Sequence, residues 1–313
     1  MSEKLTIAVV GATGAQGGGL VRAIAADKSG RFKARALTRD PNSDKAKALA
    51  DLGAELVQAN VDDEESLKRA FEGAHGAFCV TFFWDHFSAE KEVAEAAAMV
   101  RAAKHANVKH VIWSTLEDTR DFVPLSDDRM PTLHGKYKVP HFDGKGEANP
   151  LFAEVPTTLF NTCFYWENFI YFGMGPKRGP DGVLALNLPM GDKRLPGIGA
   201  GDIGKCAYGV FQRPELIGKT VGIAGEHISG ADMARAFGDT YGKVVKYNAV
   251  PFDVYRSLGF PGADDLGNMF QFKHDFNEQY VGARDIGFAK KLNPELQDFQ
   301  TWLTANKSKI TVE

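Results

Sequence analysis

Seven residues near the amino terminus form a glycine-rich turn of the kind that binds phosphate. The segment Gly11-Ala12-Thr13-Gly14-Ala15-Gln16-Gly17 follows the apolar run Leu5–Val10 and precedes a helix expected at Gly18–Ala26. Gly11 permits a tight turn, Gly14 lets the backbone approach a pyrophosphate, and Gly17 lets the helix pack closely on the strand. The N–H groups at the start of such a helix attract phosphates. The G-x-x-G-x-x-G spacing in this strand–turn–helix context therefore predicts a dinucleotide site.

The end of the next apolar run distinguishes between NAD and NADP. An NAD site usually places an acid about 20 residues after the glycine turn, where it binds the ribose. Here the order is Leu37-Thr38-Arg39-Asp40, so Arg39 comes first, and a guanidinium can pair bidentately with a 2′-phosphate. Thr38 and Ser43 add hydroxyl donors, whereas Asp40 would suit a ribose. The pattern favours NADP(H), and the alternative is that Arg39 is a solvated charge at a strand end.

Alternating apolar runs and helix-patterned stretches must position this turn. The apolar runs are nearly continuous, which is typical of strands covered on both faces. The expected strands are Leu5–Val10, Phe32–Thr38, Ala54–Ala59, Gly76–Phe82, His110–Ser114 and Thr157–Thr162, and the expected helices between them are Gly18–Ala26, Asp44–Leu52, Glu64–Phe71 and Ala89–His105. Strand–helix alternation with short links predicts an α/β, Rossmann-type doubly wound parallel sheet.

The sequence changes character after about residue 170. Gly and Pro are dense from Gly173 to Gly201, around a short apolar run at Val183–Leu188. Helices are then expected to open at Asp202 and Ser229 and to cover Pro251–Leu258, Ala263–Phe276 and Pro294–Ala305. We therefore expect an NADP-binding Rossmann domain over 1–170. A smaller, mostly helical unit over 171–313 would share a cleft with it, and some of its segments would return to the sheet.

Composition excludes several classes of protein. The chain has 313 residues and a net charge of −3, so bulk positive charge cannot hold it to nucleic acid. The longest nearly apolar run, Gly76–Trp84, has nine residues, whereas a membrane helix needs about 20. Three distant cysteines without a CxxC pair favour neither a disulfide scaffold nor a zinc site, and no metal site is expected. With no signal peptide at its start, the chain is expected in the cytoplasm, and a nuclear location stays open.

Several motifs resemble the NmrA-like family, an atypical branch of the short-chain dehydrogenase/reductase superfamily. In the first half they are GATGAQGG, ALTRDP, GAELVQANVDD, VTFFWD and HFDGKGE. In the second half they are YWENF, LPMGDK, LGFPGADDLGNMF and LNPELQDFQTWL. The resemblance covers nearly the whole chain and is closest to the NADPH-sensing subgroup of the family.

The resemblance implies a role for each matching position. Gly11 to Gln16 would hold the pyrophosphate, and Arg39 to Ser43 would surround the 2′-phosphate. The remaining implied contacts are Asn60 and Val61 beside the adenine, Thr81, Phe82 and Phe83 along the path to the nicotinamide ribose, Lys145 at the ribose hydroxyls, and Tyr165, Trp166, Glu167 and Asn168 at the nicotinamide end. Where Asn60 stands, the family often has an acid.

The catalytic pattern of short-chain reductases is incomplete in this chain. Those enzymes use a Tyr four residues before a Lys, and the Lys lowers the Tyr pKa and grips the ribose. Lys145 has the matching context, but His141 stands where the Tyr would be. Ser114 occupies the end of the fifth strand, where a hydroxyl would steady the substrate oxygen. The candidate catalytic residues are therefore Lys145, His141 and Ser114.

Three functions follow from this incomplete pattern. In the first, the protein binds NADP(H) and changes its shape or partners with the cofactor level, without turnover. In the second, it reduces a carbonyl or enone with Lys145 or His141 as the acid. In the third, it is an interaction module with a structural nucleotide. We rank them in that order, and a regulatory protein partner and a homodimer are both left open.

Overall fold

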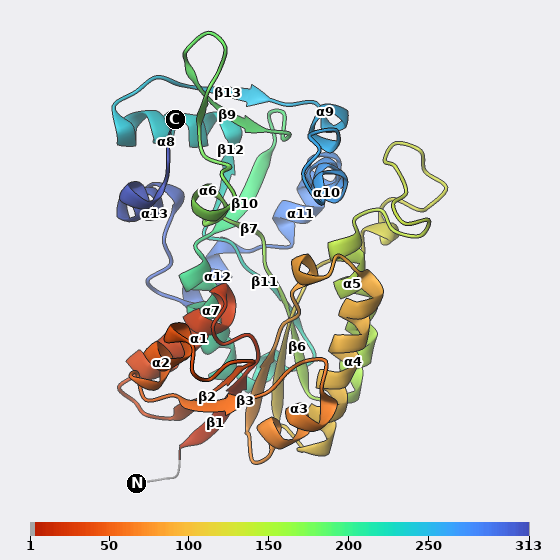
Figure 1. Ribbon diagram of the computed structural model, residues 1–313, viewed down its shortest axis with the longest axis vertical. Coiled ribbons are helices and arrows are strands. Elements are labelled where there is room, and N and C mark those ends of the chain that lie inside the picture. The colour runs from red at the N-terminus through yellow and green to blue at the C-terminus, as the bar shows by residue number, and fades with distance from the viewer. Residues whose placement is uncertain (1–3, 313) are drawn as a thin grey trace.

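A seven-stranded parallel sheet lies in the lower half of the molecule, as Figure 1 shows it, in a computed structural model that describes residues 4–312. The strand order is β11-β6-β5-β4-β1-β2-β3, and every neighbouring pair is parallel. The strands are β1 (Leu5–Val9), β2 (Phe32–Thr38), β3 (Glu55–Gln58), β4 (Gly76–Cys79), β5 (His110–Thr115), β6 (Thr157–Asn161) and β11 (Thr220–Gly222). The order 3-2-1-4-5-6 is that of the Rossmann fold, so the predicted fold class is confirmed. The returning segment is β11.

Helices cover both faces of this sheet. On one face lie α1 (Ala15–Ala26), α2 (Asp44–Ala50), α7 (Ala200–Phe211) and α12 (Ile286–Leu292), and on the other lie α3 (Glu64–Phe71), α4 (Ala89–His105) and α5 (Pro140–Ala148) (Figure 1). Each face has its own buried apolar cluster, which includes Leu20 and Ile203 on the first and Phe71 and Met99 on the second. Near-continuous apolar strands were the sequence signal for this double coverage.

Helices α1 and α7 pack backbone to backbone. A Cβ atom at Gly204 would lie 2.1 Å from the carbonyl carbon of Gly19, so the two helices approach as closely as glycine allows. This contact holds the helix that begins at the glycine-rich turn. It also ties a helix from the second half of the chain to the first.

The chain leaves the sheet earlier than expected after β4. That strand ends at Cys79, whereas the apolar run predicted a strand to Phe82. The short 3₁₀ turn η1 (Phe83–Asp85) follows, and Phe83 is buried against the rings of Trp84 and His141. Phe83 is apolar because it packs against His141 of α5, and not because the strand continues, whereas Phe82 is exposed. The next helix, α4, is capped by Ser88, whose hydroxyl accepts from the backbone N–H of Lys91.

The second half adds helices and two small sheets. Its helices are α6 (Asn168–Tyr171), α8 (Gly230–Tyr241), α9 (Phe252–Arg256), α10 (Ala263–Asp275), α11 (Asn277–Gly282) and α13 (Phe299–Asn306). The small sheets are β12-β10-β7 and β13-β9-β8, built from β7 (Phe164–Tyr165), β8 (Lys177–Arg178), β9 (Leu184–Leu188), β10 (Arg194–Ile198), β12 (Glu226–Ser229) and β13 (Val245–Ala249). Further 3₁₀ turns are η2 (Thr119–Asp121), η3 (Asn149–Glu154), η4 (Pro214–Leu216) and η5 (Lys307–Lys309).

The helical character of this half was predicted, but the two small sheets were not. The helix start expected at Ser229 is confirmed, because the Ser229 hydroxyl caps α8: it accepts from the N–H of Asp232 and donates to the Asp232 carboxylate. A third apolar cluster, centred on Trp166, Phe237 and Phe299, holds these elements together.

The three cysteines are buried and unbonded. Burial raises the pKa of Cys163 to about 12, which leaves no reactive thiolate there near neutral pH. Within residues 4–312, no helix combines the length and the apolar character needed to cross a membrane.

Candidate functional site

The glycine-rich turn presents an open backbone at the start of α1. Gly11 has φ +62°, a left-handed conformation that favours glycine, and Gly11 and Gly14 are both exposed. A Cβ atom at Gly17 would lie 2.5 Å from the Gly11 carbonyl oxygen, so the turn folds tightly over the helix. The first turn of α1 has no acidic residue, and no described side chain caps it. A phosphate therefore fits this cradle chemically and sterically.

Arg39 is the flexible cation beside the turn. Its Nη1 lies 3.1 Å from the Asp85 carboxylate, and both side chains are more than half exposed. Thr38 exchanges hydrogen bonds with the Asp40 backbone, and the Ser43 hydroxyl donates to the Asp40 carbonyl and caps α2. Because both hydroxyls are bonded to the backbone of the loop, the Arg39 guanidinium is the group of this segment that can bind an anion. An exposed ion pair is weak, and a 2′-phosphate could replace Asp85.

The residues predicted for the adenine and for the path to the nicotinamide follow β3 and β4. Asn60 accepts from the Asp62 N–H and holds its own turn, and Val61 is half-buried beside it. Phe82 is 60% exposed, whereas Phe83 is buried. The carboxyl edge of the sheet thus brings these residues to the side where ligands bind in open α/β sheets.

Lys145 is held at this edge by oxygen atoms of Thr81 and Glu92. Its Nζ donates to the Thr81 hydroxyl at 2.6 Å and lies 3.0 Å from Oε1 of Glu92. Thr81 in turn donates to the same carboxylate oxygen at 2.6 Å. The Glu92 side chain has no exposed surface, and the Lys145 ammonium also lies 5.1 Å from the centroid of the Trp113 ring. The carboxylate fixes the position of an ammonium that could then bind a ribose hydroxyl.

Ser114 does not lie in this cluster but bonds to the glycine-rich turn. Its hydroxyl donates to Oε1 of Gln16 at 2.7 Å, and Nε2 of Gln16 donates to the Tyr165 hydroxyl at 2.6 Å. Burial raises the pKa of Tyr165 to about 12. The structure thus joins the end of β5, the turn and β7 through one polar chain. In this position the Ser114 hydroxyl donates its hydrogen bond to Gln16 and not to a substrate oxygen.

His141 pairs with a residue from the second half of the chain. Both oxygens of Asp265, in α10, accept from His141: one from Nδ1 and the other from the backbone N–H. The imidazole is buried between Trp84 and Phe142, with ring centroids 4.9 Å away in each case. Nε2 has no hydrogen-bond partner among the described residues, so it is the nitrogen available to a ligand.

The residues predicted for the nicotinamide end need one correction. Trp166 has no exposed surface and packs against Phe299 and Trp302 in the third apolar cluster, so its side chain belongs to the core. Glu167 accepts from the Ala200 N–H and from the Trp302 indole, and burial raises its pKa. Asn168, next in the chain, begins α6. Of the four residues predicted there, Tyr165 is the one that bonds to the glycine-rich turn.

Sequence reasoning missed Glu92 and Asp265. Glu92 was not among the expected site residues, although it shares the buried face of α4 with Ala89, Ala96 and Met99. A carboxylate at an apolar position of a helix was the available signal. Asp265 had no local signal, because it meets His141 across 124 residues of chain.

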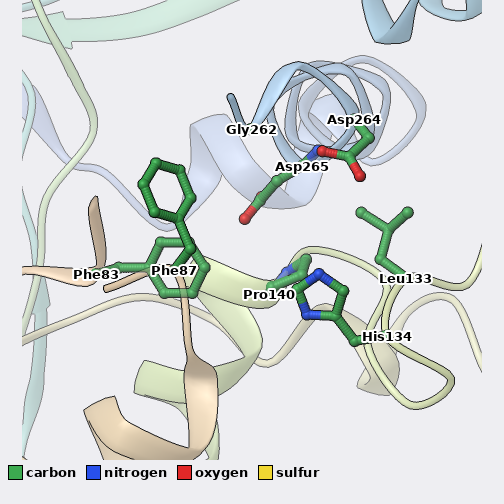
Figure 2. Close-up of a pocket in the computed structure, with 8 residues that line it drawn as sticks. All are labelled: Phe83, Phe87, Leu133, His134, Pro140, Gly262, Asp264 and Asp265. Carbon is green, nitrogen blue, oxygen red and sulfur yellow. The ribbon is translucent and has the colours of Figure 1, made fainter. Parts of the chain in front are cut away.

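A pocket of about 220 Å³ opens beside these residues (Figure 2). Its walls come from the segment after β4, the start of α5, the loop before α5 and the start of α10. The lining residues are Phe83, Phe87, Leu133, His134, Pro140, Gly262, Asp264 and Asp265. The first of these segments also carries Thr81, and α5 carries Lys145.

Comparisons with known proteins agree with this architecture. The chain is 31% identical over 298 residues to NmrA-like family domain-containing oxidoreductase FrzB of Cladobotryum sp, covering 88% of this chain and 85% of that protein. It is 30% identical over 262 residues to oxidoreductase malD of Malbranchea aurantiaca, covering 78% and 75%. A solved structure of a doubly substituted NmrA mutant superposes with a TM-score of 0.79 at 25% identity, covering 97% and 95%.

Another solved NmrA, described as a negative transcriptional regulator in complex with NADP, has a TM-score of 0.76 at 24% identity and covers 97% and 95%. The profile of the NmrA-like family matches residues 3–303. The chain therefore belongs to the NmrA-like family.

Proposed function

We propose that the protein is an NADP(H)-dependent oxidoreductase that delivers a hydride to an organic acceptor. The observation that carries this proposal is the pocket bounded by Phe83 and Pro140. It borders the two segments that hold Thr81 and Lys145, so an acceptor would lie next to the cofactor. Two relatives, FrzB and malD, are named oxidoreductases, which also supports this proposal.

In this proposal each part of the carboxyl edge binds one part of the cofactor. The glycine-rich turn binds the pyrophosphate, Arg39 binds the 2′-phosphate, and Lys145 with Thr81 binds the nicotinamide ribose. A related solved structure contains NADP and another contains NAD, which supports a nicotinamide dinucleotide here. The cofactor supplies the hydride when it is bound in its reduced form. Residues 1–170 bind this cofactor, and residues 171–313 close the acceptor side.

The chain's own residues then orient the reactants. Glu92 holds the Lys145 ammonium in place, and Asp265 holds His141 through Nδ1. In this proposal Nε2 of His141 supplies the proton to an acceptor that needs one. The hydroxyl of Ser114 stays on Gln16, so we assign it to holding the glycine-rich turn.

A second candidate is a regulator that binds NADP(H) without turnover. The His in place of the catalytic Tyr favours it, and so does the engaged Ser114. The description of the NmrA structures as a transcriptional regulator is consistent with it. In that case the cofactor-bound surface would act on a partner protein in the cytoplasm or nucleus, with a homodimer as one arrangement.

The two candidates separate in one assay. NADPH oxidation is followed at 340 nm with a panel of aldehydes, ketones, quinones, enones and iminium salts, next to a binding titration by calorimetry. The oxidoreductase proposal expects acceptor-dependent oxidation that Lys145→Ala reduces strongly. Lys104→Ala, a change at an exposed lysine of α4, is the control and should leave the rate unchanged. Tight NADPH binding without oxidation on any acceptor would favour the regulator.

A further inference from the structure

The pocket shown in Figure 2 has the rings of Phe83 and Phe87 at one end, Asp264 and Leu133 at the other, and Asp265 between them. Phe83 and Phe87 lie with their ring centroids 6.0 Å apart, and Leu133 and Pro140 extend the apolar surface. The opposite wall is the first turn of α10, which presents Asp264 and Asp265. In Figure 2 the Asp265 carboxylate points from α10 toward the space beside the phenylalanine rings.

The charge of the pocket is one-sided. None of its eight lining residues is a Lys or an Arg. Asp265 is bonded to His141, but Asp264 is exposed and forms no ion pair with any residue in the range 4–312. Its Oδ1 accepts only the N–H of Asp265. An anionic ligand would therefore meet two carboxylates, with His134 as the one basic side chain of the lining, whereas a cation would meet a carboxylate and aromatic rings.

The pocket also adjoins the proposed cofactor site. Phe83 is two residues from Thr81, which receives the Lys145 ammonium, and Pro140 opens the helix that carries Lys145. From these observations, and resting on the proposed function, we propose that the pocket is the acceptor subsite. We further propose that its acceptor is an organic cation, an iminium group carried on an apolar ring.

The chemistry of an iminium acceptor matches the residues that are present. The iminium carbon accepts the hydride from the reduced nicotinamide and forms a C–H bond. The C=N π pair moves to nitrogen, which becomes neutral, and the cofactor is left as NADP⁺. Charge and atoms balance with no proton added, so the step needs no Tyr. A carbonyl acceptor would need a proton at oxygen, and the usual donor is replaced here by His141, whose Nδ1 is bonded to Asp265.

Binding can be tested with two ligands of nearly the same shape. N-methyl-3,4-dihydroisoquinolinium carries a permanent positive charge, and 1-tetralone is a neutral ketone with the same fused rings. Calorimetry with the full chain, with and without NADP⁺, should show the cation binding at least about tenfold more tightly than the ketone. Asp264→Asn and Phe87→Leu should each remove most of that preference. Asp253→Asn makes the same charge change on exposed α9, outside the pocket lining, and should leave the preference intact.

Turnover with NADPH completes the test. We expect reduction of the isoquinolinium to the tertiary amine, and a rise in KM with little change in kcat for Asp264→Asn. Equal or tighter binding of the ketone overturns the inference, and so does an Asp264→Asn protein that keeps the preference. Reduction of ketones but not of the bound cation overturns it as well, while the oxidoreductase proposal stands. If no acceptor at all oxidises NADPH, the proposed function itself fails.

Discussion

The ammonium of Lys145 lies 3.0 Å from a carboxylate oxygen of Glu92 whose side chain has no contact with solvent. Thr81 bridges the two, since it accepts from Lys145 and donates to Glu92. The second oxygen of Glu92 has no partner within the described residues. A charge held in this way is fixed in direction, which is what a ribose-binding ammonium needs. Glu92 is therefore the residue that positions Lys145.

Glu92→Gln should weaken NADPH binding. The amide keeps the size of the side chain but removes the charge that faces Lys145, so the ammonium is held less firmly. Loss of a charged hydrogen bond costs about 1.5–3 kcal/mol, or roughly ten- to a hundredfold in Kd. Calorimetric titration with NADPH measures this change in Kd. Glu90→Gln, at an exposed position of the same helix, is the control, and an unchanged Kd for Glu92→Gln would remove the positioning role.

Arg39→Ala should weaken NADPH binding far more than NADH binding. Within residues 4–312 the Arg39 guanidinium pairs only with Asp85, and the 2′-phosphate is the feature that separates the two cofactors. The expected loss for NADPH is again about 1.5–3 kcal/mol. Asp85→Asn removes the competing carboxylate and should leave NADPH binding unchanged or tighter. Equal losses for both cofactors in Arg39→Ala would show that Arg39 does not read the phosphate.

Lys273→Met should stabilise the folded chain near neutral pH. Lys273 is 2% exposed, and among residues 4–312 its Nζ hydrogen-bonds only to the Met269 sulfur and lies over three aromatic rings. Burial, followed by the charge of Arg284, lowers the pKa of Lys273 to about 7. The folded chain therefore bears the full cost of this charge below pH 7. The cost falls as pH rises from about 7 toward the ordinary lysine pKa.

Urea denaturation between pH 6.5 and 9.5 tests this. The unfolding free energy of the wild type should rise relative to that of Lys273→Met across this range, and the variant should be about 1–4 kcal/mol more stable at pH 7. A variant that is less stable at pH 7, or a difference that does not change with pH, would contradict the account of Lys273.

Gly204→Ala should destabilise the fold by about 1–3 kcal/mol or more. Its added methyl would lie 2.1 Å from the Gly19 carbonyl carbon, so α1 and α7 would have to separate. Gly201→Ala, three residues earlier in the same helix, meets nothing within 4 Å and should be neutral or stabilising by up to about 1 kcal/mol. Thermal denaturation of the Gly204→Ala and Gly201→Ala proteins measures the difference in stability. Equal Tm values would show that the two helices tolerate the extra methyl group at Gly204.

The central sheet and its helices were predictable because their signals are local. The apolar run at β2 and the helix-patterned stretches at α3 and α4 predicted these elements at their observed bounds. The two small sheets gave no such signal, since β7 and β8 have only two residues each, and β7 pairs Phe164 with Gly197 of β10, a separate part of the chain. The same holds for Asp265, whose partner His141 is reached only through the tertiary fold.

Within the site, residue types were easier to predict than their contacts. The glycine-rich turn has the open backbone and the left-handed Gly11 that its sequence implied. Thr81 and Lys145 were both expected at the ribose, and the structure brings them together. Trp166 looked like a cofactor residue by its place in a motif, but the third apolar cluster buries it. Burial of that kind depends on elements from the whole second half of the chain.

Transfer of deuterium from [4-²H]NADPH to an acceptor tests the oxidoreductase proposal most directly. Both C4 labels are tested separately, and the product is analysed by mass spectrometry after incubation with ketones, enones and iminium salts. The proposal predicts one deuterium in the product of at least one acceptor class, from one of the two labels, and loss of the signal in Lys145→Ala. NADPH that binds tightly but passes deuterium to no acceptor would contradict it and leave the regulator as the function of this chain.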